Sequence, residues 1–371
     1  MELSLYLSKN TDDGSAKGTP SPLHRDLIGI QYLRGVAATI VVLFHLLPQL
    51  EHLGYTLEIG SGLSGGVDVF FVISGLIMWI TTGSSVSPMK FWRHRLVRIV
   101  PLYWIATTMM VLVMVFAPSL LQTAQFDLEH ILASYAFIAW VHPTTGLMDP
   151  VVLPGWTLNY EMFFYFVFGL LLLLRRDRRL VVAIIFFGAL PVAGEFLTQG
   201  MADKSFGRAQ IAFYTSTITL EFVFGMLLGE LYTRTSIIGI IGRQYGWIIM
   251  LIGFGGLLFM ADALPGMPRY ITRGTPALLL VAGTLSQDCA GVVRKYWLPL
   301  LAGNASYSLY LMHPFVLSAT SQVWRKLMLD TSIVGLWMFA IVSVGSCLIV
   351  AAISFHLLEA PLIAYFRKRR R

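Results

Sequence analysis

IGIQYLRGVAATIVVLFHLLPQL, residues 28–50, is long and apolar enough to cross a membrane as one helix, which needs about 20 residues. Arg34 and His45 interrupt this run. They are eleven positions apart, about three helical turns, so both side chains lie on one face of the helix. Ionisable groups inside hydrocarbon are costly and usually mark a functional path. We therefore predict that this helix lines a polar cavity that is reached from the cytoplasm.

The whole chain has the composition of a multi-pass membrane protein. Of its 371 residues, 56% are hydrophobic and 13% are charged, whereas about 25% are charged in soluble domains. We predict an all-α, polytopic transmembrane helical bundle with about ten spans. We expect a cytoplasmic tail at 1–27, one transmembrane domain at 28–366 and a basic cytoplasmic tail at 367–371. The predicted spans are 28–50, 66–82, 97–117, 156–174, 180–197, 210–232, 246–263, 271–287, 298–321 and 333–362.

The net charge of +7 reflects membrane topology rather than nucleic-acid binding, because the basic residues cluster beside apolar runs. Most of the 27 lysines and arginines fall in segments on one side of the ten predicted spans. The positive-inside rule then places both termini in the cytoplasm. A further short apolar run at 129–141 would invert every later loop if it crossed, so we predict that it is re-entrant or interfacial. In the ten-span topology, the loops on the outer side of the membrane carry only these basic residues: Lys204, Arg208, Arg269, Arg273, Arg325 and Lys326.

Two further features limit the chemistry. Cys289 and Cys347 match no metal-ligand spacing and give no support for a disulfide, so we expect no metal site. The segment 117–155 is the longest stretch between spans, and its second half is rich in proline and glycine. We interpret that half as an ordered, functional loop.

Four ionisable residues from separate spans meet at one depth under this topology. His45, Asp68, Glu161 and His313 all fall near the outer mouth of the bundle. Ionisable groups that have partners in a partly dry cavity suit general acid–base catalysis. We predict that these four residues form the catalytic centre.

Arg95 and Arg98 lie one helical turn apart at the predicted inner end of a span, within KFWRHRLVRIVP at 90–101. A pair of guanidinium groups on one face suits the geometry of phosphate. The alternative is purely topological, because basic residues are common at the inner face of any membrane helix. On the residues alone, the two interpretations are evenly balanced.

Structural explanations also exist for the other polar residues. His45 or His313 could be a core histidine bonded to a backbone carbonyl, and Asp68 could cap its helix. A run of glycines favours close helix packing over phosphate binding. That run comprises Gly62, Gly65, Gly66 and Gly75. We also expect structural or interfacial roles for Glu195, Glu221, Glu230 and His356.

Taken in order, these motifs resemble the acyltransferase-3 family of bacterial integral-membrane O-acyltransferases, over about residues 28–365. The first is arginine and histidine separated by ten residues, Arg34 to His45. Thr157 stands where the family usually has serine, which keeps the hydroxyl group. The remaining motifs are GGVDVFFVISG at 65–75, RLVRIVP at 95–101, WTLNYEMFFY at 156–165, SYSLYLMH at 306–313 and EAP at 359–361.

The resemblance implies transfer of an acyl group, acetyl by default, from cytoplasmic acyl-CoA to a hydroxyl of an extracytoplasmic or lipid-linked saccharide. It implies acyl-CoA as a donor substrate and no permanently bound cofactor. The expected partners are therefore acyl-CoA, the saccharide acceptor and membrane lipid, without nucleic acid. Exopolysaccharide modification is the expected setting.

We assign the expected roles as follows. Arg95 and Arg98 hold the phosphates of the donor, and Arg34 assists them deeper in the protein. His45 acts as general base or accepts the acyl group briefly, and Asp68 or Glu161 orients it. The residues expected to position the substrates are His313, Ser74, Trp156, Asn159, Tyr160, Tyr307 and Tyr310.

Two other classes of protein fit part of the pattern. A transporter of a sugar or acyl unit would also carry intramembrane charges and broken helices, but it leaves the arginine pair unexplained. A scaffold or sensor without catalytic activity predicts that neutralising the buried groups changes only stability. A membrane acyltransferase of another class, with one catalytic histidine, would lack this order of motifs.

Overall fold

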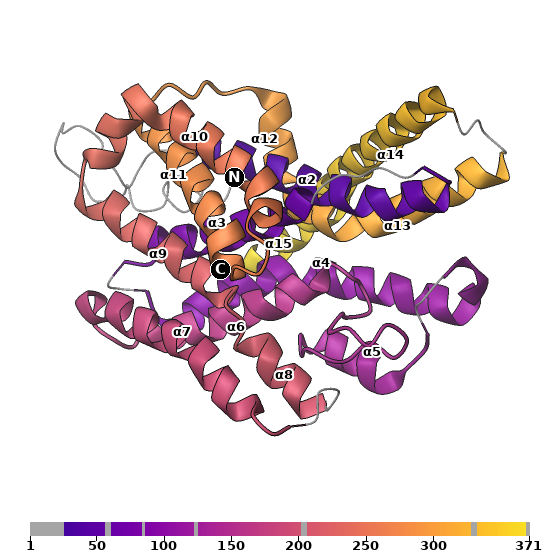
Figure 1. The fold of residues 1–371 in the computed structure, drawn as a ribbon, viewed down its shortest axis with the longest axis horizontal. Helices are drawn as coiled ribbons and strands as arrows, with labels where there is room; N and C mark the ends of the chain where they lie inside the picture. The colour runs from indigo at the N-terminus through magenta and orange to yellow at the C-terminus, as the bar shows by residue number, and fades with distance from the viewer. Residues whose placement is uncertain are drawn as a thin grey trace. The chain divides into compact units, whose positions relative to one another are not determined.

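The computed structural model describes residues 26–55, 61–83, 86–121, 125–201, 206–327 and 332–368. Throughout these ranges the regular secondary structure is helical and no strand forms (Figure 1). The predicted all-α class is therefore confirmed. The chain folds as two compact units: unit 1 comprises Met1–Ser85 and Leu220–Ser306, and unit 2 comprises Val86–Thr219 and Tyr307–Arg371.

Seven helical segments of the described chain are long and apolar enough to cross a membrane, as expected of a multi-pass membrane protein. Helices also occupy the predicted spans at 156–174, 271–287 and 298–321, although they do not meet the same criteria of length and composition. The count of about ten spans stays a prediction. The seven segments are Ile28–His52, Ser61–Thr81, Pro88–Phe116, Arg176–Thr198, Phe206–Arg234, Ile237–Ala263 and Ile333–Lys368.

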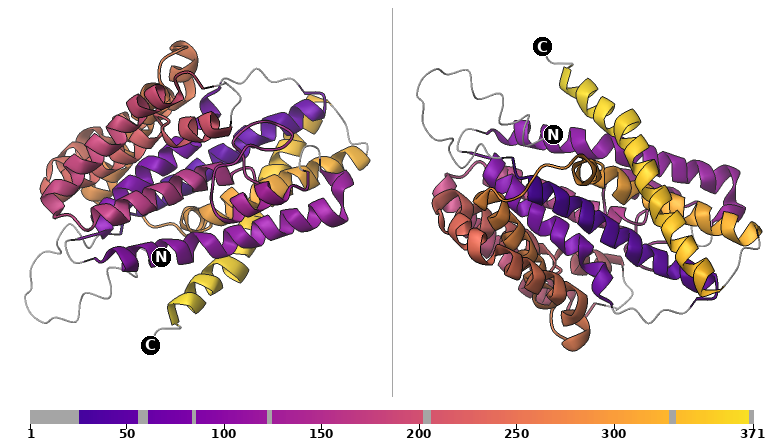
Figure 2. Two further views of the ribbon diagram at one scale, coloured as in Figure 1. Left: turned by 90° about the horizontal axis from the view of Figure 1, so that it is seen from below. Right: turned by 90° about the horizontal axis from the view of Figure 1, so that it is seen from above.

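Unit 1 has one apolar core, which α2, α3, α9, α10 and α11 share through side chains such as Ile30, Val72 and Leu280. Within it α10 and α11 lie side by side (Figure 1, Figure 2). The bounds are α2 Ile28–His52, a 3-10 turn at Ser61–Gly65, α3 Gly66–Thr81, α9 Thr219–Arg234, α10 Ile237–Ala263, a π-helical turn at Tyr270–Gly274, α11 Thr275–Ala290 and α12 Trp297–Asn304.

Glycines allow the helices of unit 1 to pack at short distance. A side chain at Gly75 would collide with the carbonyl oxygen of Phe222 on α9. Gly62 and Gly66 lie equally close to backbone atoms of α10 and α2. The interpretation of these glycines as helix-packing residues is therefore confirmed.

Unit 2 contains the remaining helices, among them a long α4 and the pair α6 and α7. It also holds the short helices α5 and α8. The bounds are α4 Pro88–Phe116, a 3-10 turn at Pro118–Leu120, α5 Leu128–Tyr135, α6 Gly155–Leu171, α7 Arg176–Thr198, α8 Phe206–Tyr214, α13 Ser306–Lys326, α14 Ile333–Ser354, a π-helical turn at Phe355–Glu359 and α15 Ala360–Lys368.

The helix α4 begins at Pro88, well before the predicted span at 97–117, because its first turn is capped. The Ser87 hydroxyl accepts a hydrogen bond from the Lys90 backbone N–H at 3.4 Å, and proline is favoured at the first helical position. Arg95 therefore lies about two turns inside α4 rather than at its end.

The apolar run at 129–141 forms only α5, which has eight residues. At 1.5 Å per residue this helix is about 12 Å long, whereas the hydrocarbon layer is about 30 Å thick. It is therefore too short to cross the bilayer, as the charge pattern predicted. The chain turns at Phe137, whose φ is +58°, and continues without regular structure to α6.

The register between α4 and α6 determines where the motif residues of unit 2 lie. A side chain at Gly155, the first residue of α6, would come within 2.9 Å of the Tyr103 ring, halfway along α4. Farther along, the Trp92 indole N–H donates to the carbonyl oxygen of Tyr165 at 2.7 Å. The two helices are thus antiparallel, and α6 runs beside the N-terminal half of α4.

Candidate active site

Arg34 and His45 lie on α2, as predicted, and both are half-buried. The Arg34 guanidinium donates to the side-chain oxygen of Gln31 at 3.2 Å. The amide nitrogen of Gln31 then donates to the side-chain oxygen of Asn304 on α12 at 2.8 Å. Gly303 packs directly on the backbone of Gln31, so α12 holds this chain of hydrogen bonds in place. The arginine is therefore oriented by residues that sequence analysis did not select.

The ring of His45 is held by its own helix. Its Nδ1 lies 2.9 Å from the carbonyl oxygen of Val41, which can only accept a hydrogen bond. The proton of the neutral ring is therefore on Nδ1, and the lone pair is on Nε2. This contact is the one expected of a core histidine, and it also fixes the tautomer that a general base requires.

Asp68 has a different partner from the one we predicted. Its carboxylate is fully buried and accepts two hydrogen bonds from Arg269, at 2.9 and 2.8 Å. Gly66 packs against Ala37 and the Val41 side chain, so the first turn of α3 lies beside α2. That Asp68 or Glu161 orients His45 stays a prediction. The alternative of a helix cap fails, since no side chain caps α3.

A second carboxylate joins this ion pair inside unit 1. Glu221 is fully buried, and one of its oxygens lies 4.0 Å from the Arg269 guanidinium. Arg273 points toward the same region and donates to the Ser61 carbonyl oxygen at 3.5 Å. Two fully buried carboxylates and two half-buried arginines thus lie together, although neither oxygen of Glu221 accepts a hydrogen bond from a described residue. This cluster gives Glu221 the structural role that the sequence analysis expected.

In unit 2, Arg95, Tyr165 and Glu161 form one contact chain. The Tyr165 hydroxyl donates a short hydrogen bond to the Glu161 carboxylate. The Arg95 guanidinium lies over the rings of Phe91 and Tyr165, 5.5 and 5.7 Å from their centroids, a cation–π arrangement. Arg98 lies within electrostatic range of the same tyrosine. The predicted arginine pair and the predicted carboxylate are therefore neighbours.

This placement corrects the predicted depth of Glu161. We expected Glu161 near the outer mouth with His313, whereas the register of α6 against α4 brings it level with the arginine pair. His313 lies elsewhere, because its neighbour Tyr310 bonds to the first turn of α6 through Thr157, at 2.6 Å. Within unit 2, His313 thus lies about two helical turns along the bundle from Glu161 and the arginine pair. His45 and Asp68 belong to unit 1, and the meeting of all four residues stays a prediction.

His313 is fully buried, and its Nδ1 lies 3.2 Å from the Leu309 carbonyl oxygen, as in a core histidine. Tyr310 donates to the Pro154 carbonyl oxygen at 3.0 Å, and the Tyr307 hydroxyl donates to that of Ile99 at 2.7 Å. These two tyrosines therefore join α13 to α6 and α4. Their contacts give them a helix-packing role, and a substrate-positioning role stays a prediction.

The motif residues of α6 point in different directions. Tyr160 stacks on Phe213, with centroids 4.0 Å apart, and donates to the Phe213 carbonyl oxygen at 2.7 Å, so it anchors α8. Trp156 lies half-buried beside Tyr160. Asn159 is 1% exposed, and neither polar atom of its amide has a hydrogen-bond partner among the described residues. Such a buried amide is costly unless a further group binds it, which supports Asn159 as a substrate-positioning residue. Ser74 lies half-buried on α3 of unit 1.

Sequence analysis underestimated one carboxylate of unit 2. Glu359 is buried in the π-helical turn that follows α14, and it accepts a hydrogen bond from Ser308 at 2.6 Å. It also lies within electrostatic range of Tyr307, as does Arg98. The only signal was its place in the EAP motif. Among the described residues no group of three or more His, Cys, Asp or Glu could hold a metal ion.

Two histidines order the loop between α5 and α6. The Nδ1 of His142 accepts hydrogen bonds from the Thr144 and Thr145 backbone N–H groups, at 3.3 and 3.4 Å. Burial lowers the pKa of His142, and the nearby His130 ring, 5.0 Å away, lowers it further. Burial raises the pKa of Asp149 in the same loop. The prediction of an ordered loop is confirmed, while its function stays a prediction.

These features, a helical membrane bundle with a motif arginine pair, tyrosine and carboxylate in contact, define a membrane-embedded transferase site. The chain belongs to the acyltransferase-3 family, whose model, described as an acyltransferase domain, matches residues 27–355. It is an O-acetyltransferase of that family.

Relatives cover most of the chain. It is 39% identical over 334 residues to the exopolysaccharide production protein ExoZ of Rhizobium meliloti, an alignment that covers 89% of this chain and 96% of that protein. It is 23% identical over 397 residues to the peptidoglycan O-acetyltransferase OatA of Listeria monocytogenes, covering 97% of this chain and 59% of OatA. The O-acetyltransferase OatA of Staphylococcus aureus is 24% identical over 372 residues, covering 91% of this chain and 57% of OatA. No solved structure matches the chain.

Proposed function

We propose that this enzyme transfers an acyl group, acetyl by default, from cytoplasmic acyl-CoA to a hydroxyl of an extracytoplasmic or lipid-linked saccharide. The family match over residues 27–355 carries the proposal, because it includes nearly every helix that holds a motif residue. The similarity to ExoZ, a protein named for exopolysaccharide production, supports a polysaccharide precursor as the acceptor.

Arg95 and Arg98 bind the phosphates of the donor, and Arg34 assists them. The contact of Arg95 with two aromatic rings supports this role, because it restricts the orientation of the planar guanidinium, whose N–H groups can bind a phosphate. The hydrogen bond that holds Arg34 to Gln31 supports a fixed rather than a mobile cation. The basic residues along one side of the spans support entry of the donor from the cytoplasm of the bacterial inner membrane, where both termini then lie.

His45 acts as the general base. Its Nε2 takes the proton of the acceptor hydroxyl while the oxygen attacks the thioester carbonyl. The carbon–sulfur bond then breaks, the acyl group stays on the saccharide oxygen, and the thiolate of CoA receives the proton from His45. The hydrogen bond from Nδ1 to Val41 supports this role, because it leaves the lone pair on Nε2.

The test is transfer of radiolabelled acetyl groups from acetyl-CoA to lipid-linked saccharides in membranes that contain the enzyme. We expect His45→Ala to abolish transfer while the protein still inserts and is recovered at normal yield. His52→Ala is the matched control, because His52 is exposed in the last turn of the same helix. Normal transfer by His45→Ala would refute the catalytic assignment, and saccharide movement without acetyl-CoA would favour a transporter.

A further inference from the structure

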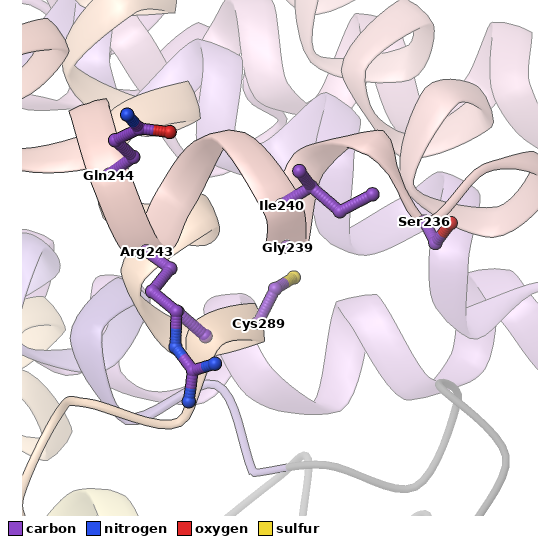
Figure 3. A pocket seen from close by; sticks show the side chains of 7 residues that line it. Ser236, Gly239, Ile240, Arg243, Gln244 and Cys289 are labelled. Carbon is purple, nitrogen blue, oxygen red and sulfur yellow. The ribbon is translucent and has the colours of Figure 1, made fainter.

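A pocket of about 650 Å³ lies in unit 1 where the first turns of α10 meet the end of α11 (Figure 3). It is distant in sequence from every motif residue discussed above. Gly239 leaves Cys289 uncovered, since a side-chain carbon built on this glycine would lie 3.5 Å from the Cys289 Cβ. The side chains that line the pocket include Ser236, Ile240, Arg243, Gln244 and Cys289.

The pocket offers a cation that nothing else in the described chain neutralises. Arg243 is exposed, and its guanidinium makes no hydrogen bond or ion pair with any described residue. Figure 3 shows its side chain near that of Cys289. The pocket wall adds a hydroxyl from Ser236 and an amide from Gln244. A guanidinium beside neutral polar groups is a favourable site for a phosphate, which it can bind through paired hydrogen bonds.

An apolar stripe continues from the pocket along α10. Ile240, Trp247 and Leu251 are 69%, 58% and 60% exposed, and their spacing places them on one face of the helix. Because α10 is long and apolar enough to span the membrane, its first turns lie at the membrane interface and this stripe faces the hydrocarbon. Phosphate-binding groups are thus followed by an apolar track that leads into the bilayer.

We propose that this pocket binds the headgroup of an anionic phospholipid. The lipid phosphate contacts Arg243, and one acyl chain lies along Ile240, Trp247 and Leu251. Phospholipid is the occupant that fits both parts, because a soluble phosphate uses the arginine but leaves the apolar stripe without a role. The proposal does not depend on the identity of the acyl donor or acceptor.

Cys289 supplies a direct readout of occupancy. The other thiol, Cys347, is 1% exposed, and Cys347→Ser leaves Cys289 as the single cysteine. The protein is placed in nanodiscs of phosphatidylcholine with or without phosphatidylglycerol, and the rate of maleimide labelling at Cys289 is measured. With the anionic lipid at about ten times its Kd, labelling should be about tenfold slower, because only the empty pocket reacts.

Three variants and an inorganic phosphate control separate the explanations. Arg243→Gln should remove the protection, whereas Arg294→Gln, which removes an exposed arginine outside the pocket, should keep it. Equal slowing in wild type and Arg243→Gln would show a general surface-charge effect and would overturn the proposal. Equal protection by inorganic phosphate in phosphatidylcholine discs would also overturn it in favour of a soluble anion. Gly239→Leu should fill the pocket and make the labelling rate independent of lipid.

Discussion

The hydroxyl of Tyr165 donates a hydrogen bond to the carboxylate of Glu161, one turn earlier on α6. The ring of the same tyrosine lies 5.7 Å from the Arg95 guanidinium. One side chain therefore contacts both the predicted phosphate-binding arginine and the motif carboxylate. Its two contacts use different parts of the residue, so mutation can separate them.

Replacing Tyr165 with Phe should weaken catalysis more than donor binding. The ring stays against Arg95, while Glu161 loses its hydrogen-bond donor. Hydrogen bonds to charged groups contribute about 1.5–3 kcal/mol, so we expect kcat to fall about tenfold or more. The measurement is steady-state acetyl transfer at varied acetyl-CoA, which yields kcat and KM separately.

Tyr165→Leu is the companion variant, because it removes the ring as well. It should add a rise in the KM for acetyl-CoA to the loss in kcat, since Arg95 no longer has its aromatic support. If Tyr165→Phe and Glu161→Gln both retain wild-type kcat, this hydrogen bond has only a packing role.

The buried pair of Asp68 and Arg269 should stabilise unit 1 rather than take part in the chemistry. Asp68→Asn removes the fully buried carboxylate that Arg269 pairs with. Breaking a fully buried ion pair typically costs about 3–5 kcal/mol, and we expect a smaller loss here because Arg269 is half-buried and keeps Glu221 at 4.0 Å. We expect a marked drop in the melting temperature of the detergent-solubilised enzyme. The double variant Asp68→Asn with Arg269→Gln should recover part of that loss, together with activity. Recovery of stability without any activity would instead give Asp68 a role in transfer.

This ion pair shows which part of the structure the sequence could not predict. Asp68 and Arg269 are 201 positions apart, and the arginine directly precedes a π-helical turn at Tyr270–Gly274. No local sequence pattern predicts that π-helical turn, so residue spacing could not identify Arg269 as the partner of Asp68. The sequence analysis selected Asp68 for a catalytic role, and the partner of this carboxylate, Arg269, could only be found in the three-dimensional structure.

The helices themselves were predictable, because hydropathy is a local property. Residues 28–50 predicted α2 almost to its ends, and 66–82 predicted α3. The depth of Glu161 was not predictable, because it depends on where α6 starts beside α4. That position is set by the irregular segment after Phe137, whose path has no repeating pattern. Topology rules assume that each span begins at the membrane surface, and α6 begins halfway along α4.

Replacing Gln31 with Ala should raise the KM for acetyl-CoA severalfold with little change in kcat. Gln31 accepts a hydrogen bond from Arg34 and is itself held by Asn304, so its loss removes one contact that orients the arginine without removing the charge. A change limited to KM is expected if Arg34 contributes equally to binding the donor and the transition state. Asn304→Ala should shift KM in the same direction by a smaller factor.

Thr39→Val provides the matched control for Gln31. It removes another side-chain hydrogen bond on α2, from the Thr39 hydroxyl to the Gly35 carbonyl oxygen at 2.9 Å, without touching Arg34. This variant should keep the wild-type KM. Equal effects of the two substitutions would indicate a general disturbance of α2 instead of a specific role for Gln31.

Acid should loosen the loop between α5 and α6. The lowered pKa of His142 means that the folded loop holds a neutral ring, while the unfolded segment binds a proton at about pH 6.5. The unfolded state therefore binds more protons as the pH falls through 6.5, and stability declines there until His142 also becomes protonated in the folded loop. His130 faces this ring, with the two ring centroids 5.0 Å apart, and lowers the pKa of His142 further. Asp149 acts in the opposite sense, because its raised pKa favours the folded loop at acidic pH, in the lower range where carboxyls titrate.

Hydrogen exchange of the 142–147 amides, corrected for the intrinsic effect of pH, should therefore show less protection at about pH 5 than at about pH 7.5. The physical cause is specific, since a protonated Nδ1 can no longer accept from the Thr144 and Thr145 amides. His142→Asn tests this cause, because an asparagine side-chain oxygen can accept the same bonds without titrating in this range. The variant should keep its protection at both pH values. Equal acid sensitivity in His142→Asn would show that His142 is not the cause of the effect. Unchanged protection in the wild type would exclude a role for this imidazole as a pH-dependent support of the loop.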